Sequence, residues 1–457
     1  MQPGSPQIFD VSAFMDGRKL TSFNIRLIIL SWLITFCDGL DMMMIAYTAP
    51  YIAEGMALDR TALGNVFSAG LLGTMLGAFG FAYLGDLLGR RISIVAAAIA
   101  FGILTFATGF AQNYEQLIAL RFLDGLALGG MLPLAWALNI EYAPKRLRAT
   151  VVTLIMVGYS VGTTMAGPIT NWIAPGFGWQ GVYFFAGATT LACAAGLFFN
   201  LPESIRFLVA KKRGNEQIAS ILNKLEPSAK ISAASEFVLT DEPEVKKSFR
   251  LTQLFEGRLA FITPLIWLGF AMSTLTVFLH ASWGPIILEN LDVPRKTAAW
   301  IQSAAALAGA AAGMSLMRFT DRLGPRAIAA FPTASLPVLL VMGVAPLPTP
   351  LFLFLNVLVV ALISGGHYGI LSITSIYYPT AIRANGGGWA SSVAKLGGVL
   401  GPILGGVFLS SGLPVIQVFL FMMIGPVILA FCVIGIAAIV GAAGEQVKGG
   451  ADAPANV

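Results

Sequence analysis

The stretch Gly85-Asp86-Leu87-Leu88-Gly89-Arg90-Arg91 (GDLLGRR) is repeated in outline at residues 320–326 (TDRLGPR). Its Asp, its second Gly and its last Arg all recur 235 residues further on. Two other stretches, EYAPKRLRA ending at Ala149 and YYPTAIRA ending at Ala384, share a Tyr, a Pro, an Arg and an Ala at the same spacing. One spacing shared by so many residue pairs does not arise by chance, so the sequence predicts two homologous halves.

The composition places both halves in a lipid bilayer. Of the 457 residues, 56% are hydrophobic and only 11% are charged, whereas soluble domains carry about 25% charged residues. Twelve apolar segments have close to the ~20 residues that a membrane-spanning helix needs. These segments are residues 25–50, 61–84, 92–111, 115–140, 149–172, 179–201, 258–281, 297–317, 326–345, 349–373, 386–410 and 414–441.

One long polar stretch, residues 202–257, separates the two sets of six spans. It contains KKRGNEQIASILNKLEP, whose pattern predicts an amphipathic surface helix. Because six is even, both halves cross the membrane in the same sense and are related by an axis along the membrane normal. The predicted organisation is a tail, a six-helix bundle, a linker, a second six-helix bundle and a tail, at residues 1–24, 25–201, 202–257, 258–441 and 442–457.

The basic residues set the predicted orientation. Of the 28 Lys and Arg residues, 23 lie in the two tails and in one set of alternate loops. Three lie in the opposite loops, namely Arg60, Arg295 and Lys296. Positively charged loops stay on the cytoplasmic side, so we expect both termini and the linker in the cytoplasm. The charge is spread over short loops, and we expect no nucleic-acid partner.

Several stretches resemble known families. GDLLGRR and TDRLGPR resemble the loop signatures of the major facilitator superfamily, and PESIRFL (202–208) resembles the segment that many members carry after the sixth helix. More narrowly, the chain resembles the aromatic acid:proton symporter family. The stretches that carry this resemblance are DGLD with Ala49-Pro50, RFLDGLALGGMLP through EYAPKRLR, and YPTAIRANGGGWA with GGVLGPILGG. The resemblance implies the major facilitator fold, an all-α membrane protein with twelve transmembrane helices in two pseudo-symmetric six-helix bundles.

Two carboxylates interrupt the first apolar segment. Asp38 and Asp41 lie in CDGLDMMM (37–44), three residues apart, and this spacing puts both on one face of a helix. A charged side chain at the bilayer centre costs about 2.5–3.5 kcal/mol on insertion scales, and such residues are usually functional. We expect proton coupling or substrate gating here, with polar helix packing as the alternative.

The fourth segment repeats this spacing with Arg121 and Asp124. Arg121 could pair with Asp124 or face the carboxylates of the first segment, and a purely structural charge pair is the alternative. Members of the resembled family share Arg121, but usually carry a small polar residue in place of Asp124. We expect Asp124 to take part in proton coupling.

Lys395 is the second cation inside a predicted span. The resembled family typically has Arg there, where it is similar to an anchor for the substrate carboxylate. Lys offers a point charge without the planar fork of Arg, so we expect looser carboxylate geometry. A salt bridge to a first-helix Asp is the alternative, and an anion could displace that partner.

Four further side chains within or next to apolar segments are weaker candidates. His367 and His280 are polar groups in otherwise apolar helices, and either could serve the substrate, the proton or only packing. Tyr159 and Trp283 could stack on an aromatic ring, although aromatic residues make up 11% of the chain and most of them belong to the core. The expected substrate-binding set is Arg121, Lys395, His367, Trp283 and Tyr159.

The repeated loop stretches carry charges at the predicted cytoplasmic helix ends. Such networks could latch helix ends in the outward-open state and release them inward, or could only set the topology. The expected gating residues are Asp86, Arg90, Arg91, Glu141, Arg148, Asp321, Arg322, Arg326 and Arg383.

These features predict a multi-pass transporter of the inner (plasma) membrane, working as a monomer. We expect it to take up a small aromatic carboxylate together with protons, because two intramembrane cations suit an anionic cargo. Proton-driven efflux of drugs or metabolites is the alternative, since the Gly158…Gly167-Pro168 pattern also fits antiporters. A membrane enzyme or sensor lacks support from any catalytic pattern. We expect no metal and no cofactor other than the proton as coupling ion.

Overall fold

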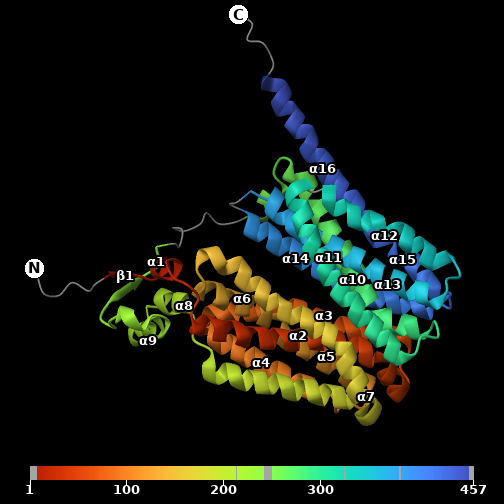
Figure 1. The fold of residues 1–457 in the computed structure, drawn as a ribbon, viewed down its shortest axis with the longest axis horizontal. Coiled ribbons are helices and arrows are strands. Elements are labelled where there is room, and N and C mark those ends of the chain that lie inside the picture. Colours follow the sequence, from red (N-terminus) through yellow and green to blue (C-terminus); the bar gives the residue numbers. More distant parts are fainter. Residues whose placement is uncertain (1–7, 213, 241–249, 324–325, 380–381, 452–457) are drawn as a thin grey trace, which may run out of the picture. The chain divides into compact units, whose positions relative to one another are not determined.

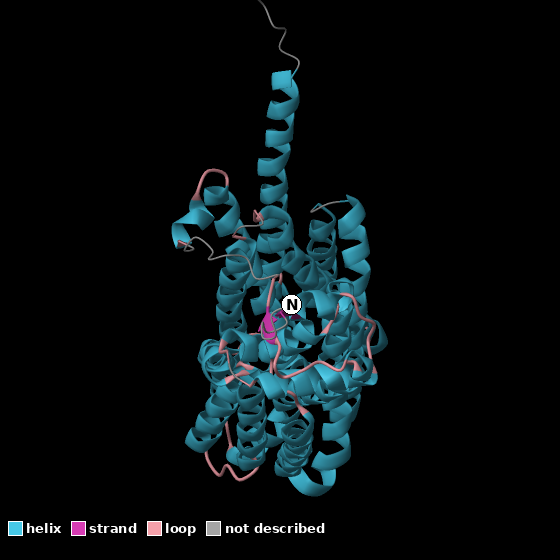
Figure 2. Ribbon diagram, turned by 90° about the vertical axis from the view of Figure 1, so that its left-hand side faces the viewer, coloured by secondary structure: helices cyan, strands magenta, loops and turns pink. Residues whose placement is uncertain are grey.

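The computed structural model describes residues 8–212, 214–240, 250–323, 326–379 and 382–451. Nearly all of this part of the chain is helical, as Figure 2 shows, and each of the twelve predicted spans coincides with helix. Nine helices within it are long and apolar enough to cross a membrane. One of these nine contains two predicted spans, and α11 and the shorter apolar helix within α12 lie outside the nine.

Two compact units make up the chain. The first consists of Met1–Met44 and Leu72–Lys246, and the second of Ile45–Leu71 and Lys247–Val457. Figure 1 labels the helices. The first half of the sequence contains α1 (Val11–Asp16), α2 (Ser22–Met56), α3 (Arg60–Leu88), α4 (Arg90–Thr108), α5 (Tyr114–Gly129), α6 (Met131–Tyr142), α7 (Arg148–Asn200), α8 (Ile205–Ala210) and α9 (Asn215–Leu225). The second half contains α10 (Leu259–Glu289), α11 (Arg295–Leu323), α12 (Arg326–Val344), α13 (Thr349–Tyr377), α14 (Arg383–Ser410), α15 (Val418–Met422) and α16 (Ile424–Ala451).

Two local sequence features explain where the helices of the first half break. The fourth predicted span is divided into α5 and α6 next to Pro133, which has no N–H to donate to the preceding turn. The fifth and sixth spans both lie in α7, which is interrupted at Gly178, where φ is 67°. That left-handed backbone favours glycine, so Gly178 lets the chain turn between two membrane-length helices.

The described part of the N-terminal tail is folded, although no pattern in the sequence predicts this. β1 (Ile8–Asp10) pairs in parallel with β2 (Glu236–Val238) of the linker. Asp10 caps α1 by accepting hydrogen bonds from the backbone N–H groups of Ser12 and Ala13. We call β1, α1, α8, α9 and β2 together the cap; Figure 1 shows its labelled elements close together at one end of the first unit.

The cap shares one hydrophobic core with the membrane helices of its unit. The predicted amphipathic helix is α9, and it buries Ile218, Ile221 and Leu222. These side chains belong to the same buried cluster as Phe101 of α4 and Leu138 of α6. The described tail and the linker as far as residue 240 are therefore integral to the first unit. The second unit has its own core, between α10, α12, α13, α14 and α16.

Candidate functional site

Both first-helix carboxylates lie inside the first unit. Asp38 and Asp41 are only 2% and 1% exposed. α2 packs unusually close to α7 at this level, because a Cβ on Gly39 would lie 2.2 Å from the carbonyl oxygen of Tyr159. The glycine of DGLD therefore permits an approach that keeps its two flanking acids in a tightly packed region.

Arg121 contacts two carboxylates at once. Its Nη1 lies 2.9 and 3.0 Å from the two oxygens of Asp41 and 2.7 Å from Oδ2 of Asp124. Thr105 of α4 donates to Oδ1 of Asp124 at 3.0 Å. Of the partners considered from sequence, Asp41 and Asp124 both pair with the guanidinium. We call Asp41, Thr105, Arg121 and Asp124 the Arg121 cluster.

The Arg121 cluster is almost completely shielded from solvent. Arg121 is 4% exposed and Asp124 is fully buried. One guanidinium faces two carboxylates, so the cluster is electrically neutral when it binds one proton. Asp38 stands one helical turn from Asp41, and among the described residues it has no cation of its own. Since an unpaired buried charge is very unfavourable, the cluster is chemically suited to bind and release protons.

The second unit contains the two histidines. Nδ1 of His367 on α13 lies 3.0 Å from the hydroxyl oxygen of Ser273 on α10. Nε2 of His280 on α10 lies 3.1 Å from Oδ1 of Asn356 on α13. Both histidines thus join the same two helices through neutral polar partners.

Lys395 lies on α14 and is half-buried. Within the described residues of its own unit it forms no ion pair, so no carboxylate there neutralises its charge. This is the property expected of a cation that binds an anionic ligand. By contrast, Arg121 is already engaged by two acids.

The two aromatic candidates have different surroundings. Trp283 is fully buried, its Nε1 donates to the carbonyl oxygen of Pro402 at 2.9 Å, and its ring meets the Phe67 ring edge-on at 5.2 Å. This placement favours a packing role for Trp283. Tyr159 is half-buried on α7, opposite Gly39.

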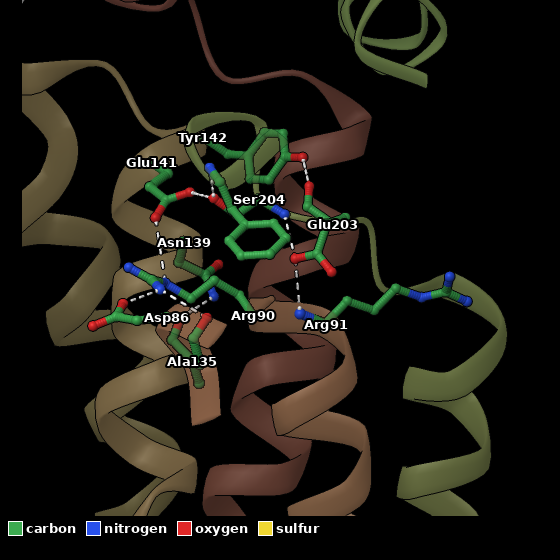
Figure 3. A network of polar contacts seen from close by, with 11 residues as sticks. Asp86, Arg90, Arg91, Ala135, Asn139, Glu141, Tyr142, Glu203 and Ser204 are labelled. Atoms are coloured by element: carbon green, nitrogen blue, oxygen red, sulfur yellow. Dashed lines mark hydrogen bonds and ion pairs between the residues drawn. The ribbon is translucent and has the colours of Figure 1, made fainter. Parts of the chain in front are cut away.

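A polar network connects the loop stretch GDLLGRR to the segment after the sixth span (Figure 3). Nη1 of Arg90 lies 2.6 Å from Oδ1 of Asp86, and its Nε lies 3.7 Å from Oε1 of Glu141. Glu141 in turn accepts a hydrogen bond from the Ser204 hydroxyl. Four helix ends of the first unit, those of α3, α4, α6 and α8, are joined in this way.

Glu203 and Ser204 also belong to this network, although neither is among the gating residues expected from the sequence. Oε1 of Glu203 accepts from the backbone N–H of Arg91 at 3.1 Å and from that of Ser204 at 2.8 Å. Tyr142 donates its hydroxyl proton to the Glu203 carbonyl oxygen. The stretch PESIRFL could have indicated both residues, because a buried Glu next to a helix-capping Ser must find hydrogen-bond donors nearby.

Arg148 has polar contacts with groups other than Asp86, Arg90 and Glu141. Its Nη2 is 3.9 Å from Asp16 of α1, which also accepts from Nζ of Lys145 at 2.7 Å. Nε of Arg148 donates to the Ala143 carbonyl oxygen at 3.4 Å.

The second repeat reproduces this last contact. Nε of Arg383 donates to the Tyr378 carbonyl oxygen at 3.1 Å, and both residues are 235 positions beyond Arg148 and Ala143. The repeat seen in the sequence therefore extends to equivalent hydrogen bonds. The side chains of Asp321, Arg322 and Arg326 lie outside the described residues.

The structure also bears on metal and cysteine chemistry. Within the described residues, no group of three or more His, Cys, Asp or Glu side chains could hold a metal ion. Sγ of Cys37 on α2 lies 3.8 Å from Sγ of Cys193 on α7, and the two are not bonded to each other.

Comparison with known proteins relates the whole chain to transporters. The Major Facilitator Superfamily model matches residues 31–365. The 4-hydroxybenzoate transporter PcaK of Pseudomonas aeruginosa is 32% identical over 413 residues, which cover 90% of this chain and 92% of that protein. The gallate transporter of Pseudomonas putida is 31% identical, with coverage of 90% and 92%. The benzoate transport protein of Acinetobacter baylyi is 30% identical, with coverage of 89% and 88%.

Solved structures share the fold at lower sequence identity. The D-xylose–proton symporter has a TM-score of 0.70 at 15% identity, over 90% of this chain and 97% of that chain. A bacterial homologue of the human lysosomal transporter Spinster has a TM-score of 0.68 at 17% identity, over 92% and 98%. The chain therefore belongs to the major facilitator superfamily; it is a membrane transporter rather than an enzyme, related over most of its length to transporters of aromatic acids.

Proposed function

We propose that this protein takes up an aromatic carboxylic acid together with protons, by alternating access across the inner (plasma) membrane. The observation that carries the proposal is the Arg121 cluster, in which one buried guanidinium is shared between Asp41 and Asp124. Such a cluster can exchange one of its two internal ion pairs for a bound proton and a ligand anion.

Competition for Arg121 links the proton to the substrate. When Asp41 and Asp124 are both ionised, the guanidinium is fully compensated and has no surplus charge for a ligand. Protonation of either acid removes one ionic partner, so Arg121 gains affinity for a substrate carboxylate. Loss of the substrate then favours release of the proton, because the unpaired guanidinium again attracts the carboxylate of its own cluster. Proton and anion are thus carried in the same direction.

The energy available matches this scheme. One proton with one monovalent carboxylate moves no net charge, so the pH gradient alone drives uptake, at about 1.4 kcal/mol per pH unit for each proton. A second proton would add the membrane potential, at about 2.3 kcal/mol per 100 mV. Asp38 provides a further carboxylate next to the cluster for such a second proton.

Lys395 and His367 are the substrate-binding residues that we propose for the second unit. Lys395 has no carboxylate partner within the described residues of that unit, and it attracts the substrate anion. The pair formed by His367 and Ser273 offers both a hydrogen-bond donor and an acceptor, which suits a polar ring substituent. Relatives named for 4-hydroxybenzoate, gallate and benzoate support an aromatic carboxylate as the substrate class.

The charge pattern supports the proposed orientation in the membrane, and the set of proposed residues supports a monomer. Both termini and the linker face the cytoplasm, because the basic residues cluster in that set of loops. The network of Asp86, Arg90 and Glu141 then lies at the cytoplasmic helix ends, where it holds the four ends of the first unit together during transport. The transporter works as a monomer, since each chain supplies the full set of proposed coupling and substrate-binding residues.

The test is uptake of radiolabelled benzoate, 4-hydroxybenzoate and gallate into cells, with and without a protonophore. We expect uptake of at least one acid that the protonophore abolishes, and that Asp41→Asn and Lys395→Ala remove. Glu115→Gln, an exposed acid at the start of α5, serves as the control and should transport normally. Unchanged proton-driven uptake in Asp41→Asn and Lys395→Ala would overturn the site. Accumulation that increases when the protonophore is added would favour the efflux alternative.

A further inference from the structure

The second unit includes a segment from the first half of the sequence. Ile45–Leu71, which comprises the end of α2, the loop after it and the start of α3, belongs to the same compact unit as α10, α11 and α14. Arg60, at the start of α3, is one of only three basic residues on the side that we propose faces outward. The contacts of this segment therefore show what holds the helix ends together on that side.

Arg295, at the start of α11, contacts two glutamates of different helices. Its Nη2 lies 2.7 Å from Oε1 of Glu54 on α2, and its Nη1 donates to the other carboxylate oxygen at 3.4 Å. Its Nε lies 3.0 Å from Oε2 of Glu289 at the end of α10. The guanidinium also stacks over the Tyr51 ring, 4.4 Å from its centroid. We call Glu54, Glu289 and Arg295 the Arg295 latch.

A second set of contacts joins α3 to α10 and α14. Nη1 of Arg60 donates to the Leu409 carbonyl oxygen at 3.0 Å, and Nη2 donates to Oδ1 of Asn290 at 2.9 Å. Two turns further along α3, the Ser68 hydroxyl donates to the Val399 carbonyl oxygen at 2.7 Å. These bonds use neutral acceptors, whereas the contacts of the Arg295 latch are ion pairs.

The cavity at this interface is unsuited to an anionic cargo. It measures about 770 Å³, and its charged lining comprises Glu54, Asp59, Arg60, Glu289 and Arg295. Three carboxylates face two guanidinium groups, and Arg295 is paired with two of these carboxylates. A substrate carboxylate would be repelled, which excludes this cavity as a second substrate site. The arginines hold helices together instead.

We infer that the Arg295 latch holds the outer entrance of the transporter shut, and that it must break each time the substrate enters from outside. The inference rests on the proposed direction of transport and topology. α2 and α3 belong to the first repeat and α10 and α11 to the second, and alternating access requires the two repeats to part on one side at a time. The contacts between these helix ends must therefore open and close in every cycle.

The exposure of the latch suits reversible opening. The Arg295 and Glu54 side chains are 29% and 67% exposed. Ion pairs in such surroundings contribute little to stability, so solvent can replace them during opening. Loss of the latch should consequently shift the population of closed and open states without unfolding the protein.

The first test measures how accessible the interface is from outside. Ser68 is 4% exposed, so a thiol introduced by Ser68→Cys should react slowly with a membrane-impermeant maleimide applied to intact cells. Adding Arg295→Gln should accelerate the reaction by about three- to tenfold. Lys296→Gln, which removes the same charge at the next residue, is the matched control and should leave the rate unchanged. The chain without Ser68→Cys gives the background from its native cysteines.

Glu54→Gln provides an independent variant and a double-mutant cycle. If Glu54 acts through Arg295, the two substitutions together should accelerate the reaction much less than the product of their separate effects. Multiplicative effects, or an unchanged reaction rate in both single variants, would overturn the latch.

Transport kinetics separate gating from simple damage. An entrance that is open more often raises the fraction of binding-competent molecules, so the apparent KM for external substrate should fall in Arg295→Gln. A merely destabilised protein would lose maximal rate with an unchanged KM. The maleimide reaction needs no substrate, so an unchanged reaction rate overturns the latch and leaves the proposed transport intact. Faster labelling in a protein that transports no aromatic acid overturns only the proposed function.

Discussion

At the scale of single residues, Arg121 is the side chain on which both the stability of the buried cluster and the proposed coupling depend. It is buried and has ion pairs with Asp41 and Asp124, so its removal leaves two carboxylates without a cation. Removing one partner of a buried ion pair costs far more stability than replacing both partners by apolar residues, because an uncompensated charge remains. The cluster therefore acts as a unit, in stability as well as in coupling.

Arg121→Leu should destabilise the protein by about 3–5 kcal/mol. Combining it with Asp41→Asn and Asp124→Ser should restore part of that loss, since no charge is then left unpaired. Thermal unfolding of the purified variants in detergent measures both effects. A triple variant less stable than Arg121→Leu alone would contradict this view of the cluster.

Asp124 is the member of the cluster at which the resembled family usually carries a small polar residue. Asp124→Ser keeps the bond from Thr105 within reach and leaves Arg121 paired with Asp41 alone. We expect transport to persist with fewer protons carried per substrate, if Asp124 takes up the second proton. The ratio of proton flux to substrate flux in proteoliposomes measures this, and an unchanged ratio would show that Asp124 carries none.

At the scale of elements, α2 positions the acids through its contact with α7. A Cβ on Gly39 would lie 2.2 Å from a backbone oxygen, which cannot move as a side chain could. Gly39→Ala should therefore cost about 1–3 kcal/mol, as overpacking does. Gly80→Ala in α3, where a Cβ would meet nothing within 4 Å, is the control and should be neutral or stabilising by up to about 1 kcal/mol. Equal unfolding temperatures for the two variants would refute the close approach.

The cap gives a pH-dependent prediction at the same scale. A hydrogen bond from Thr240, with further bonds from the α1 backbone, lowers the pKa of Asp10 below its ordinary value of 3.8. Because the pKa is lowered in the folded cap, ionised Asp10 stabilises the cap at pH values above 3.8. This stabilisation is lost as the pH falls through the pKa of the folded state. Docking of β1 should thus be constant near neutral pH and weaken only below about pH 4. Limited proteolysis of residues 8–21 across pH checks this; Asp10→Asn should be cleaved alike at all pH values.

At the scale of the whole molecule, the sequence predicted most of the helices and part of the site. Apolar length and the repeat predicted twelve spans, and helix is found at each of these positions, because a segment in lipid must satisfy its backbone internally. The cost of charge in lipid singled out Asp41, Arg121 and Asp124, which the structure brings together. The sequence could not show that Arg121 pairs with both Asp41 and Asp124. α2 and α5 are far apart in the sequence, and their packing against each other is known only from the structure.

The features that were missed lie at helix ends, near loops and in short strands. Arg295 and Glu54 lie near loops, where charges are ordinary and no pattern distinguishes a latch from a solvated surface. β1 and β2 are three residues each and more than 200 residues apart, too short for a periodic signal. Glu203 is recognisable in the sequence only as part of PESIRFL. Its carboxylate accepts hydrogen bonds from the backbone N–H groups of Arg91 in α4 and of Ser204.

The central claim is that buried acids around Arg121 couple proton and anion movement. Its most direct test is the proton flux into proteoliposomes, followed with an internal pH dye, when 4-hydroxybenzoate or another transported acid is added outside. We predict substrate-dependent internal acidification in the unmodified protein and none in Asp41→Asn, while Glu115→Gln behaves as the unmodified protein. Acidification of equal size in Asp41→Asn, or substrate uptake by the unmodified protein without any proton movement, would contradict the claim.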